Sequence, residues 1–530
     1  MIYRNCFSRL IRAALLVFSA IAPVVATAQE SPAGTTGAAS PPEIFYYVLP
    51  RSFYDSNGDG QGDLNGLRQK LDYLQELGVT SVLTTPLYYS WFYHNYFAID
   101  YRKIDPEYGT EADLVALIRE IHRRGMKFYL DMETQYVTED DEWYQKAQRR
   151  PKSKFNQYFF RDSVPMVLQS YHGESRLLCR ANLYRPEVKK YLYECYLHWL
   201  DPNGDGRFED GVDGFRIDHI MDDLDYQGRL TGLLTGFWKP LFDTLRSRHP
   251  GIRILGEQAD WASYGAEYLE RADLDAVFAF QIAGAIMAGR KDILTQRIDT
   301  TFGLTPAGKD QLIFIENHDL DRYASRVDGN LPRLKLAAAL NLLLPGTPLI
   351  YYGQELGMKG VGGGTAPNDG NDIPRREAFE WFRTVEQPGM ALWYKDTGPW
   401  WTNTNLKSDD GISLEEEKAD TGSLWQCYRQ LVGLRRQYPA LSQGQFQFLD
   451  NRNDAIFSFL RLDGDQKMLV VINLDSVAQL VILKTGNSPL PMDLHTVQRI
   501  WHSARPGRLR TDPGRLMLAL EPYGVEVLLF

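Results

Sequence analysis

The chain has 530 residues, too many for one compact core, which predicts a large domain with one or two smaller ones. Its 58 basic and 68 acidic residues give a net charge of −10 at pH 7. Because no stretch concentrates Lys and Arg into a footprint, nucleic acid is excluded as a partner. A hydrophobic share of 44% and a charged share of 24% are those of an ordinary soluble globular protein.

The first 28 residues are predicted to be a secretory signal peptide. Arg4, Arg9 and Arg12 precede the apolar run AALLVFSAIAPVVA, and the small residues ATA before Gln29 form a cleavage site. The run is too short for a comfortable membrane span, which favours secretion over an N-terminal anchor, and no later segment could span a membrane. We therefore expect a periplasmic or secreted protein. Residues 29–42 have the composition of a flexible leader.

From residue 43 onward, eight short strand-like runs alternate with helical patterns. Alternation of this kind predicts a parallel sheet, and eight units predict closure into a (β/α)₈ TIM barrel. We assign residues 43–136 and 186–444 to this barrel. The predicted strands are 44–50, 79–87, 126–132, 212–218, 252–258, 274–280, 311–317 and 347–353.

Two further units are predicted outside the barrel. Residues 137–185 are too many for a loop, so they are expected to form a small inserted domain B after the third strand. After about residue 445 the helical periodicity stops and short alternating runs follow one another, which predicts a C-terminal antiparallel β-sandwich over 445–530. The mature chain keeps Cys179, Cys195 and Cys427. A bridge between the first two and buried free thiols are both consistent with this pattern.

Four acids stand at or just after the carboxyl ends of predicted strands: Asp131, Asp218, Glu257 and Asp319. In a barrel these ends converge on the face where barrel enzymes place their chemistry. A single acid after a strand is often a helix N-cap, but that explanation accounts poorly for four acids. Carboxylates gathered at a pocket indicate glycoside cleavage, with one nucleophile and one general acid of raised pKa. Arg216 would keep the neighbouring Asp218 ionised.

These segments resemble the α-amylase superfamily, glycoside hydrolase family 13, over nearly the whole chain from residue 44. The resemblance is carried by GFRID, GEQ, FIENHDLDR, GTPLIYYGQELG and YRQLVGLRRQYPAL, in this order along the chain. It implies retaining cleavage of α-glucosidic bonds. The implied catalytic residues are the nucleophile Asp218, the acid/base Glu257, and Asp319, which binds sugar hydroxyls and stabilises the transition state. The implied substrate-binding residues are Tyr96, Phe97, Asp131, Arg216 and His318.

The first family motif is altered in this chain. The family usually has Asn and His where DMETQY has Gln135 and Tyr136, and it has Asp where CRANLYRP has Arg180. In the family, that Asn and Asp help to hold a calcium ion between barrel and inserted domain. The resemblance therefore predicts that this interdomain calcium is absent, and it puts the histidine's sugar contact in doubt.

Two other loops predict Ca²⁺ as a cofactor. DSNGDGQGD and DPNGDGRFED share a D-x-N-x-D-G core, in which short oxygen ligands alternate around glycines, as in calcium loops. One such loop alone could be an acidic turn, but two with the same core favour calcium. The expected ligands are Asp55, Asn57, Asp59, the Gln61 carbonyl and Asp63 in the first loop, and Asp201, Asn203, Asp205 and Asp210 in the second.

Three classes of function are compatible with this resemblance. The first is an endo-acting, α-amylase-like hydrolase of α-1,4-glucosidic bonds in starch-type glucans. The second is an exo-acting α-glucosidase, an oligo-1,6-glucosidase or a transglycosylase on the same scaffold. The third, a non-enzymatic binding subunit, is disfavoured because all three acids are kept. In the exo-acting members of the resembled family, Asp follows the tyrosine that corresponds to Tyr96 in HNYF. Phe97 at that position favours the endo-acting class, unless Phe97 is simply a core residue.

Overall fold

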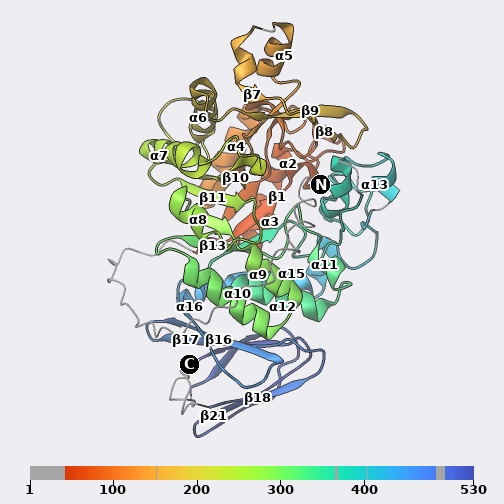
Figure 1. Cartoon of the computed structure of the whole chain (residues 1–530). Helices are drawn as coiled ribbons and strands as arrows, with labels where there is room; N and C mark the ends of the chain where they lie inside the picture. The colour runs from red at the N-terminus through yellow and green to blue at the C-terminus, as the bar shows by residue number, and fades with distance from the viewer. Residues whose placement is uncertain (1–41, 151, 365–367, 403, 485–493, 495) are drawn as a thin grey trace.

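The computed structural model describes residues 42–530 except 151, 365–367, 403, 485–493 and 495. The predicted signal peptide lies outside the described residues, as does the predicted leader except for its last residue. Figure 1 shows three parts stacked along one direction: the inserted segment with α5 (Glu142–Arg149) at one end, the barrel in the middle, and the C-terminal sheets at the other end.

Eight parallel strands close into the predicted barrel, in the order β1-β14-β13-β12-β11-β10-β5-β2. Each pairs in parallel with its two neighbours, for example Arg216 of β10 opposite Asp131 of β5. The strands are β1 (Phe45–Val48), β2 (Ser81–Thr84), β5 (Lys127–Met132), β10 (Gly214–Ile220), β11 (Arg253–Gln258), β12 (Ala276–Phe278), β13 (Asp310–Ile313) and β14 (Thr347–Tyr351). All eight lie within or close to the predicted runs, so the barrel prediction is confirmed.

Helices surround the barrel between its strands. They are α2 (Leu64–Gln69), α3 (Leu71–Leu77), α4 (Glu111–Arg123), α6 (Pro186–Leu200), α7 (Lys239–Arg248), α8 (Ala266–Arg271), α9 (Phe280–Ala288), α10 (Lys291–Leu304), α12 (Leu331–Leu343) and α15 (Leu424–Gln437). Helix α4 begins at a capping box, in which Thr110 and Asp113 satisfy each other's backbone N–H groups. The helical stretch between β1 and β2 is divided at Lys70, whose ψ of 8° is not helical.

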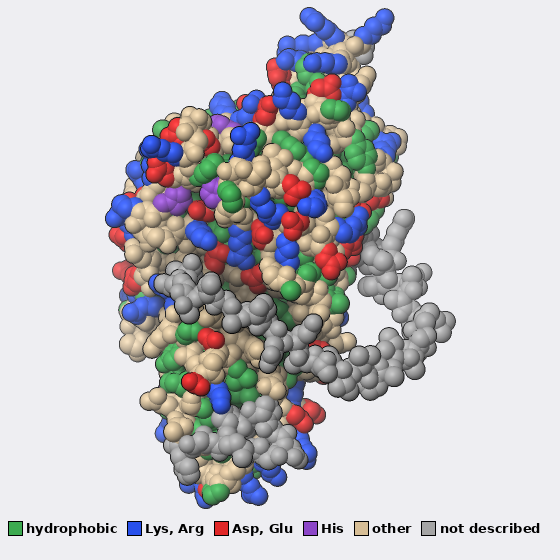
Figure 2. Space-filling model, turned by 90° about the vertical axis from the view of Figure 1, so that its left-hand side faces the viewer, with side chains coloured by type: hydrophobic (Ala, Val, Ile, Leu, Met, Phe, Trp, Pro, Cys, Tyr) green, Lys and Arg blue, Asp and Glu red, His purple; other side chains and the backbone are tan. Residues whose placement is uncertain are grey.

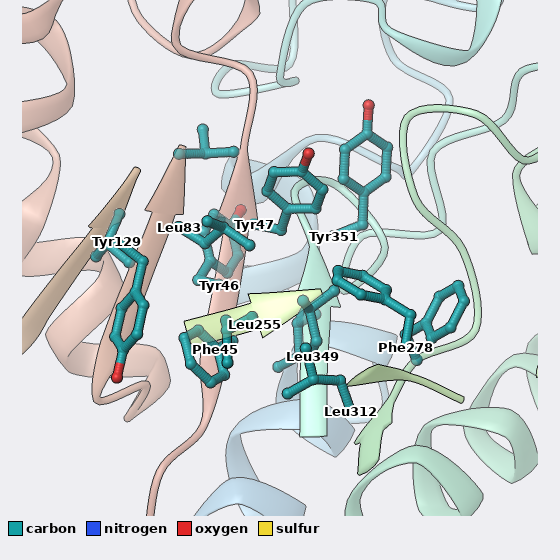
Figure 3. Close-up of a cluster of buried hydrophobic side chains, with 14 of the residues drawn as sticks. Phe45, Tyr46, Tyr47, Leu83, Tyr129, Leu255, Phe278, Leu312, Leu349 and Tyr351 are labelled. Atoms are coloured by element: carbon teal, nitrogen blue, oxygen red, sulfur yellow. The ribbon is translucent and has the colours of Figure 1, made fainter. Parts of the chain in front are cut away.

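The barrel interior is apolar at one end and polar at the other. Phe45, Leu312 and Leu349 are fully buried inside it, whereas the hydroxyl groups of Tyr47 and Tyr351 point toward the opposite end (Figure 3). Because the strands are parallel, that end is where their carboxyl termini lie. The apolar layers stabilise the barrel, and the polar end carries the side chains described below.

The segment between β5 and α6 forms a small antiparallel sheet of β6 (Tyr136–Thr138), β7 (Phe159–Phe160), β8 (Met166–Gln169) and β9 (Ser175–Ala181), with α5 (Glu142–Arg149) beside it. The tip of its β8–β9 hairpin reaches across to the loop after β14. There Gln169 forms a β-bridge with Asn368, and the Asn368 amide donates to Gln169 Oε1 at 3.1 Å. Cys179, Cys195 and Cys427 are buried free thiols, so the Cys179–Cys195 bridge is not formed.

The C-terminal part is two antiparallel sheets, in the orders β15-β16-β17-β22-β19 and β18-β21-β20. Its strands are β15 (Gln445–Phe448), β16 (Ile456–Asp463), β17 (Gln466–Asn473), β18 (Gln479–Lys484), β19 (Gln498–His502), β20 (Leu509–Asp512), β21 (Arg515–Leu520) and β22 (Val525–Leu529). Buried Leu460, Leu469, Val481 and Leu518 from the two sheets form one cluster, which makes the unit a β-sandwich as predicted.

The surface carries charges of both signs. On the face shown in Figure 2, Lys and Arg side chains are interspersed with Asp and Glu over the body of the molecule. Among the described ranges, no helix combines the length and the apolar character needed to cross a membrane.

Candidate active site

A buried arginine organises the polar end of the barrel. Arg216 lies on β10, is fully buried, and is flanked by acids on three strands. Its Nη1 donates to Asp131 Oδ2 and to Asp218 Oδ1, both at 2.6 Å, and its Nη2 donates to Glu257 Oε2. Burying charge without a partner is costly, so these carboxyl groups and the guanidinium stabilise one another. Three of the four predicted acids therefore meet on one cation.

Asp218 sits where β10 becomes irregular. The pairing of β10 with β11 shifts register between Ile217 and Ile220, and His219 takes a left-handed φ of 49°. A bulge of this kind re-aims the side chains beside it. The Asp218 side chain stays about 10% exposed, in contrast to the fully buried Asp131 and Arg216. It is therefore the carboxylate of this group that a ligand could reach.

Glu257 is the last residue but one of β11 and differs from Asp218 in its electrostatics. Burial raises the pKa of Glu257 well above its ordinary value, and the positive charge of Arg216 opposes this shift. The negative charge of Asp218, together with a hydrogen bond to it, raises the pKa further. Two carboxyl groups this close cannot both ionise easily, so the proton stays on Glu257.

Asp131 is held by two tyrosines as well as by Arg216. Tyr47 donates to Asp131 Oδ2 at 2.8 Å and Tyr96 donates to the same oxygen at 2.7 Å. Burial raises the pKa of Asp131 to about 6 despite the opposing charge of Arg216. Tyr96 was predicted at this site from its motif, whereas Tyr47 was not. Because Asp131 is fully enclosed, its role in the free protein is to hold Arg216 and the two tyrosines in place.

The fourth acid, Asp319, approaches from the loop after β13. The Asn317 side chain accepts from the Asp319 backbone N–H at 3.0 Å and fixes this turn. Arg376, from the loop after β14, donates to Asp319 Oδ1 at 3.0 Å, and His318 Nε2 lies 3.2 Å from Oδ2. Burial, together with the charges of Arg376 and Arg216, lowers the pKa of His318 well below its usual value, so the imidazole is neutral.

Aromatic rings line the space above these acids. The rings of His318 and Tyr96 stack with centroids 5.1 Å apart. Phe97, the next residue, is half-buried and meets the Tyr136 ring edge-on at 5.6 Å and the Phe92 ring at 5.5 Å. Phe97 is thus not fully enclosed in the core, but its ring is partly covered by these two neighbours.

Both predicted calcium loops fold into the same compact turn. In the first, Asp55 accepts from the backbone N–H groups of Gly58 and Gly60 at 2.7 and 2.8 Å. In the second, Asp201 accepts from Asp205 and Gly206 at 3.2 and 2.9 Å. The glycines take the left-handed φ values that such turns require.

The remaining expected ligands differ between the loops. Four side chains each accept a hydrogen bond from the backbone N–H two residues later: Asn57, Asp59, Asn203 and Asp205. Asp63 instead caps helix α2 by accepting from the Gly66 N–H. The Gln61 side chain accepts from Arg51. In the second loop, buried Asp210 Oδ1 has no hydrogen-bond partner. The donor set is one that calcium takes, yet the described residues contain no group of three or more acid, His or Cys side chains converged on a point.

The altered first motif takes part in the barrel–insert contact. The Gln135 amide donates to the carbonyl oxygens of Asp218 and His219, at 3.3 and 3.0 Å. Arg180, where the resembled family has Asp, forms ion pairs with Asp162 and Asp225. At these positions the chain thus places an amide whose NH2 group donates to the backbone after β10, and a guanidinium, which can only donate.

The arrangement suits a double displacement on a sugar. Asp218 and Glu257 both accept hydrogen bonds from the guanidinium of Arg216, which holds the two carboxyl groups close together. Short separation of the two carboxyl groups is typical of retaining glycosidases, whereas inverting enzymes keep space for a water.

Known proteins resemble this chain over most of its length. The family model "Alpha amylase, catalytic domain" matches residues 47–444. "Alpha-amylase 3" of Dictyoglomus thermophilum is 30% identical over 82% of this chain and 85% of that protein. "Probable oligo-1,6-glucosidase 2" of Bacillus subtilis is 26% identical over 81% and 89%. The crystal structure of an alpha-amylase from H. orenii superposes with a TM-score of 0.77 at 25% identity, covering 93% of this chain and 100% of that one.

Proposed function

Because the chain belongs to the alpha-amylase family of α-glucan hydrolases and transglycosylases, we propose that it is a retaining α-glucan hydrolase of amylase type. The observation that carries the proposal is the pair of carboxyl groups on Arg216, one partly accessible and one with a strongly raised pKa. From the predicted signal peptide we also propose that the enzyme is periplasmic or secreted. N-terminal sequencing of the mature protein, expected to begin at Gln29, tests that location.

In the proposed mechanism Asp218 attacks the anomeric carbon while Glu257 protonates the departing glycosidic oxygen. The Glu257 carboxylate then takes a proton from water, which attacks the glycosyl–enzyme ester and frees Asp218. Two inversions leave the α-configuration unchanged. Asp319, positioned by Arg376 and His318, would bind sugar hydroxyls, and Tyr96 would stack on the sugar. Arg216 keeps the carboxyl groups in place throughout.

We propose endo-acting cleavage of α-1,4 bonds as the specificity. Position 97 offers an aromatic ring instead of a carboxylate that could grip a terminal sugar. The guanidinium of Arg376, which could pair with such a carboxylate, instead donates hydrogen bonds to Asp319 and, at 2.9 Å, to the Tyr93 hydroxyl. A glucan chain could therefore continue past the cleaved bond.

One observation favours the alternative, an exo-acting α-glucosidase or a transglycosylase. The β8–β9 hairpin joins the loop after β14 through Gln169 and Asn368, and Tyr171 meets the rings of Tyr93 and Trp393 edge-on, with centroids 5.7 and 5.4 Å away. This contact crosses one side of the barrel mouth and could restrict a long chain.

The two specificities separate on maltoheptaose blocked at its non-reducing end. We expect the blocked substrate to be cleaved to short maltooligosaccharides, because an internal bond needs no free end. Product analysis by chromatography checks this, with unblocked maltoheptaose as the control. Release of glucose alone from the unblocked substrate, with no action on the blocked one, would establish the exo-acting alternative. Pullulan and cyclodextrins, run in parallel, report on linkage and transfer.

We also propose that the two D-x-N-x-D-G loops bind Ca²⁺. Asp55, Asn57, Asp59, the Gln61 carbonyl and Asp63 would hold one ion, and Asp201, Asn203, Asp205 and Asp210 the other. The support is the shared turn geometry and the unpartnered buried oxygen of Asp210. We propose that these ions stabilise the fold and take no part in catalysis.

EDTA is expected to lower the thermal midpoint, because an ion bound only by the folded state stabilises that state. At 100 times the dissociation constant, calcium contributes about 2.7 kcal/mol per site. Differential scanning calorimetry with and without EDTA measures the change, and Asp59→Ala and Asp205→Ala assign it to a loop. Readdition of Ca²⁺ is the control. An unchanged melting curve, with no calcium in elemental analysis of undialysed protein, contradicts the proposal.

A further inference from the structure

The backbone after Asp218 is held in an unfavourable conformation. His219 has φ 49°, which costs a residue with a Cβ on the order of 1 kcal/mol or more and persists only where neighbours enforce it. Two contacts do so. The Gln135 amide donates to the carbonyls of Asp218 and His219, and His219 Nε2 lies 3.0 Å from Asp225 Oδ1. The direction of the Asp218 side chain therefore depends on partners outside β10.

Asp225 is the centre of the second contact. It has φ 53°, its side chain is nearly buried, and it accepts from the Tyr136 hydroxyl at 2.9 Å as well as from His219. Burial alone would raise its pKa, but the hydrogen bond from His219 and the charges of His219 and Arg180 lower it below the ordinary value. Asp225 is thus a buried carboxylate that keeps its charge.

The cation that neutralises Asp225 comes from the inserted segment. Arg180 on β9 places Nε 2.5 Å from Asp225 Oδ2, and its Nη1 pairs with Asp162. Only 11% of the Arg180 side chain is exposed, so its ion pairs are shielded from water and salt. Arg229 also reaches Asp162, at 3.3 Å, but half of its side chain is in solvent. Of the two arginines, Arg180 therefore makes the shielded ion pairs between the insert and the loop after β10, beside the hydrogen bond from Tyr136.

We propose that Arg180 and Asp225 are positioning residues for catalysis, through which the inserted domain holds His219 and thereby aims Asp218. This rests on the proposed role of Asp218 as nucleophile. The chain of contacts runs from β9 through the guanidinium to Asp225, from Asp225 to the His219 imidazole, and along the backbone to Asp218. Small displacements of a nucleophile are costly in rate, about 100-fold for 1 Å.

A simpler role would be to fasten the inserted domain to the barrel. That role predicts a lower thermal midpoint for variants at Arg180 or Asp225, with normal turnover below the midpoint. The positioning role predicts in addition a fall in kcat with little change in KM, since the aim of the nucleophile matters in the transition state and less for substrate binding. The two parameters therefore separate the roles.

The test compares Arg180→Ala and Asp225→Asn with the matched control Arg229→Ala, all in the full-length chain. Steady-state kinetics on maltoheptaose are measured well below each variant's melting midpoint. We expect kcat to fall roughly 10- to 100-fold in the first two, with KM within about threefold. Arg229→Ala should stay within about twofold of the parent, because its ion pair is exposed. Arg180→Lys should recover part of the lost kcat.

The double variant Arg180→Ala/Asp225→Asn adds a second criterion. If both residues act through one contact, the kcat of the double variant should equal that of the worse single variant. Independent roles would instead multiply the two losses. Asp225→Asn preserves the side-chain shape, so it keeps the test open should Arg180→Ala fail to fold. Normal kcat in both single variants, with Asp218→Asn inactive, overturns the inference. Activity in Asp218→Asn would instead overturn the proposed function on which the inference rests.

Discussion

Replacing Asp218 with Asn is expected to reduce kcat on maltoheptaose by roughly four orders of magnitude or more, because the amide cannot form the glycosyl ester. The fold should survive, since the side chain has nearly the same shape and is partly exposed. Circular dichroism and the melting midpoint verify the fold, and sensitive product detection measures the residual rate.

Glu257→Gln is the matched comparison. It removes the general acid but leaves the nucleophile, so the loss should be about 10²- to 10⁴-fold on a natural glucan. The loss should shrink on a glycosyl fluoride, whose leaving group needs less protonation. Proton NMR of fresh parent product should show the α-anomer first. Equal losses of Glu257→Gln on both substrates, or a β-anomer appearing first, would contradict the assignment.

The sequence allowed the convergence of the acids to be predicted, because strand ends in a parallel barrel must meet. Asp131, Asp218 and Glu257 indeed bind one guanidinium, and Asp319 reaches the same end of the barrel through its loop. Arg376 could not be predicted in this way. It lies 57 positions after Asp319, in a long loop after β14. No periodicity relates two such loop residues.

Tyr47 shows a second limit of the sequence. The run IFYYVLP places Tyr46 and Tyr47 side by side, and successive strand residues point to opposite faces. Tyr46 donates to Glu355 outside the barrel, whereas Tyr47 donates to Asp131 inside it. In a strand buried on both faces, hydrophobicity does not alternate, so the pattern cannot tell which tyrosine faces inward.

The strands of the fold were predictable to within a few residues, but some elements were not. The apolar runs of β16, β17, β18 and β22 indicated the sandwich, while β20 and β21 carry charged ends that hide their alternation. Lys70 interrupts an otherwise regular helical pattern, and its ammonium lies over the rings of Tyr54 and Trp381, at 3.8 and 4.4 Å. Such tertiary contacts leave no local signature.

The second large effect is expected at Arg216. Substituting this residue would leave three buried carboxyl groups without the cation that they share. Arg216→Met keeps much of the apolar stem and removes the charge. Removing one partner of a buried ion pair typically costs 3–5 kcal/mol, so we expect a large fall in the melting midpoint and loss of activity. The stability loss should also depend on pH.

The sign of that dependence follows from the acids. In the folded parent the pKa of Asp131 is about 6 and that of Glu257 is raised well above its ordinary value, chiefly by burial. Acids whose pKa is raised by folding stabilise the fold fully below their unfolded pKa of about 4, and this contribution is lost as the pH rises through the folded value. Without Arg216, which opposes the shift, both pKa values should rise further.

Arg216→Met should therefore be less stable at pH 8 than at pH 5, and this fall in stability with pH should be steeper than in the parent. Scanning calorimetry at both pH values measures this. Arg435→Met is the matched control, since buried Arg435 donates to the carbonyls of Leu342 and Leu344 and forms no ion pair with an acid in the described part of the chain. Its midpoint should be lowered about equally at both pH values. Equal losses at pH 5 and pH 8 in Arg216→Met would mean that the guanidinium acts through packing alone, and that the carboxyl groups around it do not depend on its charge.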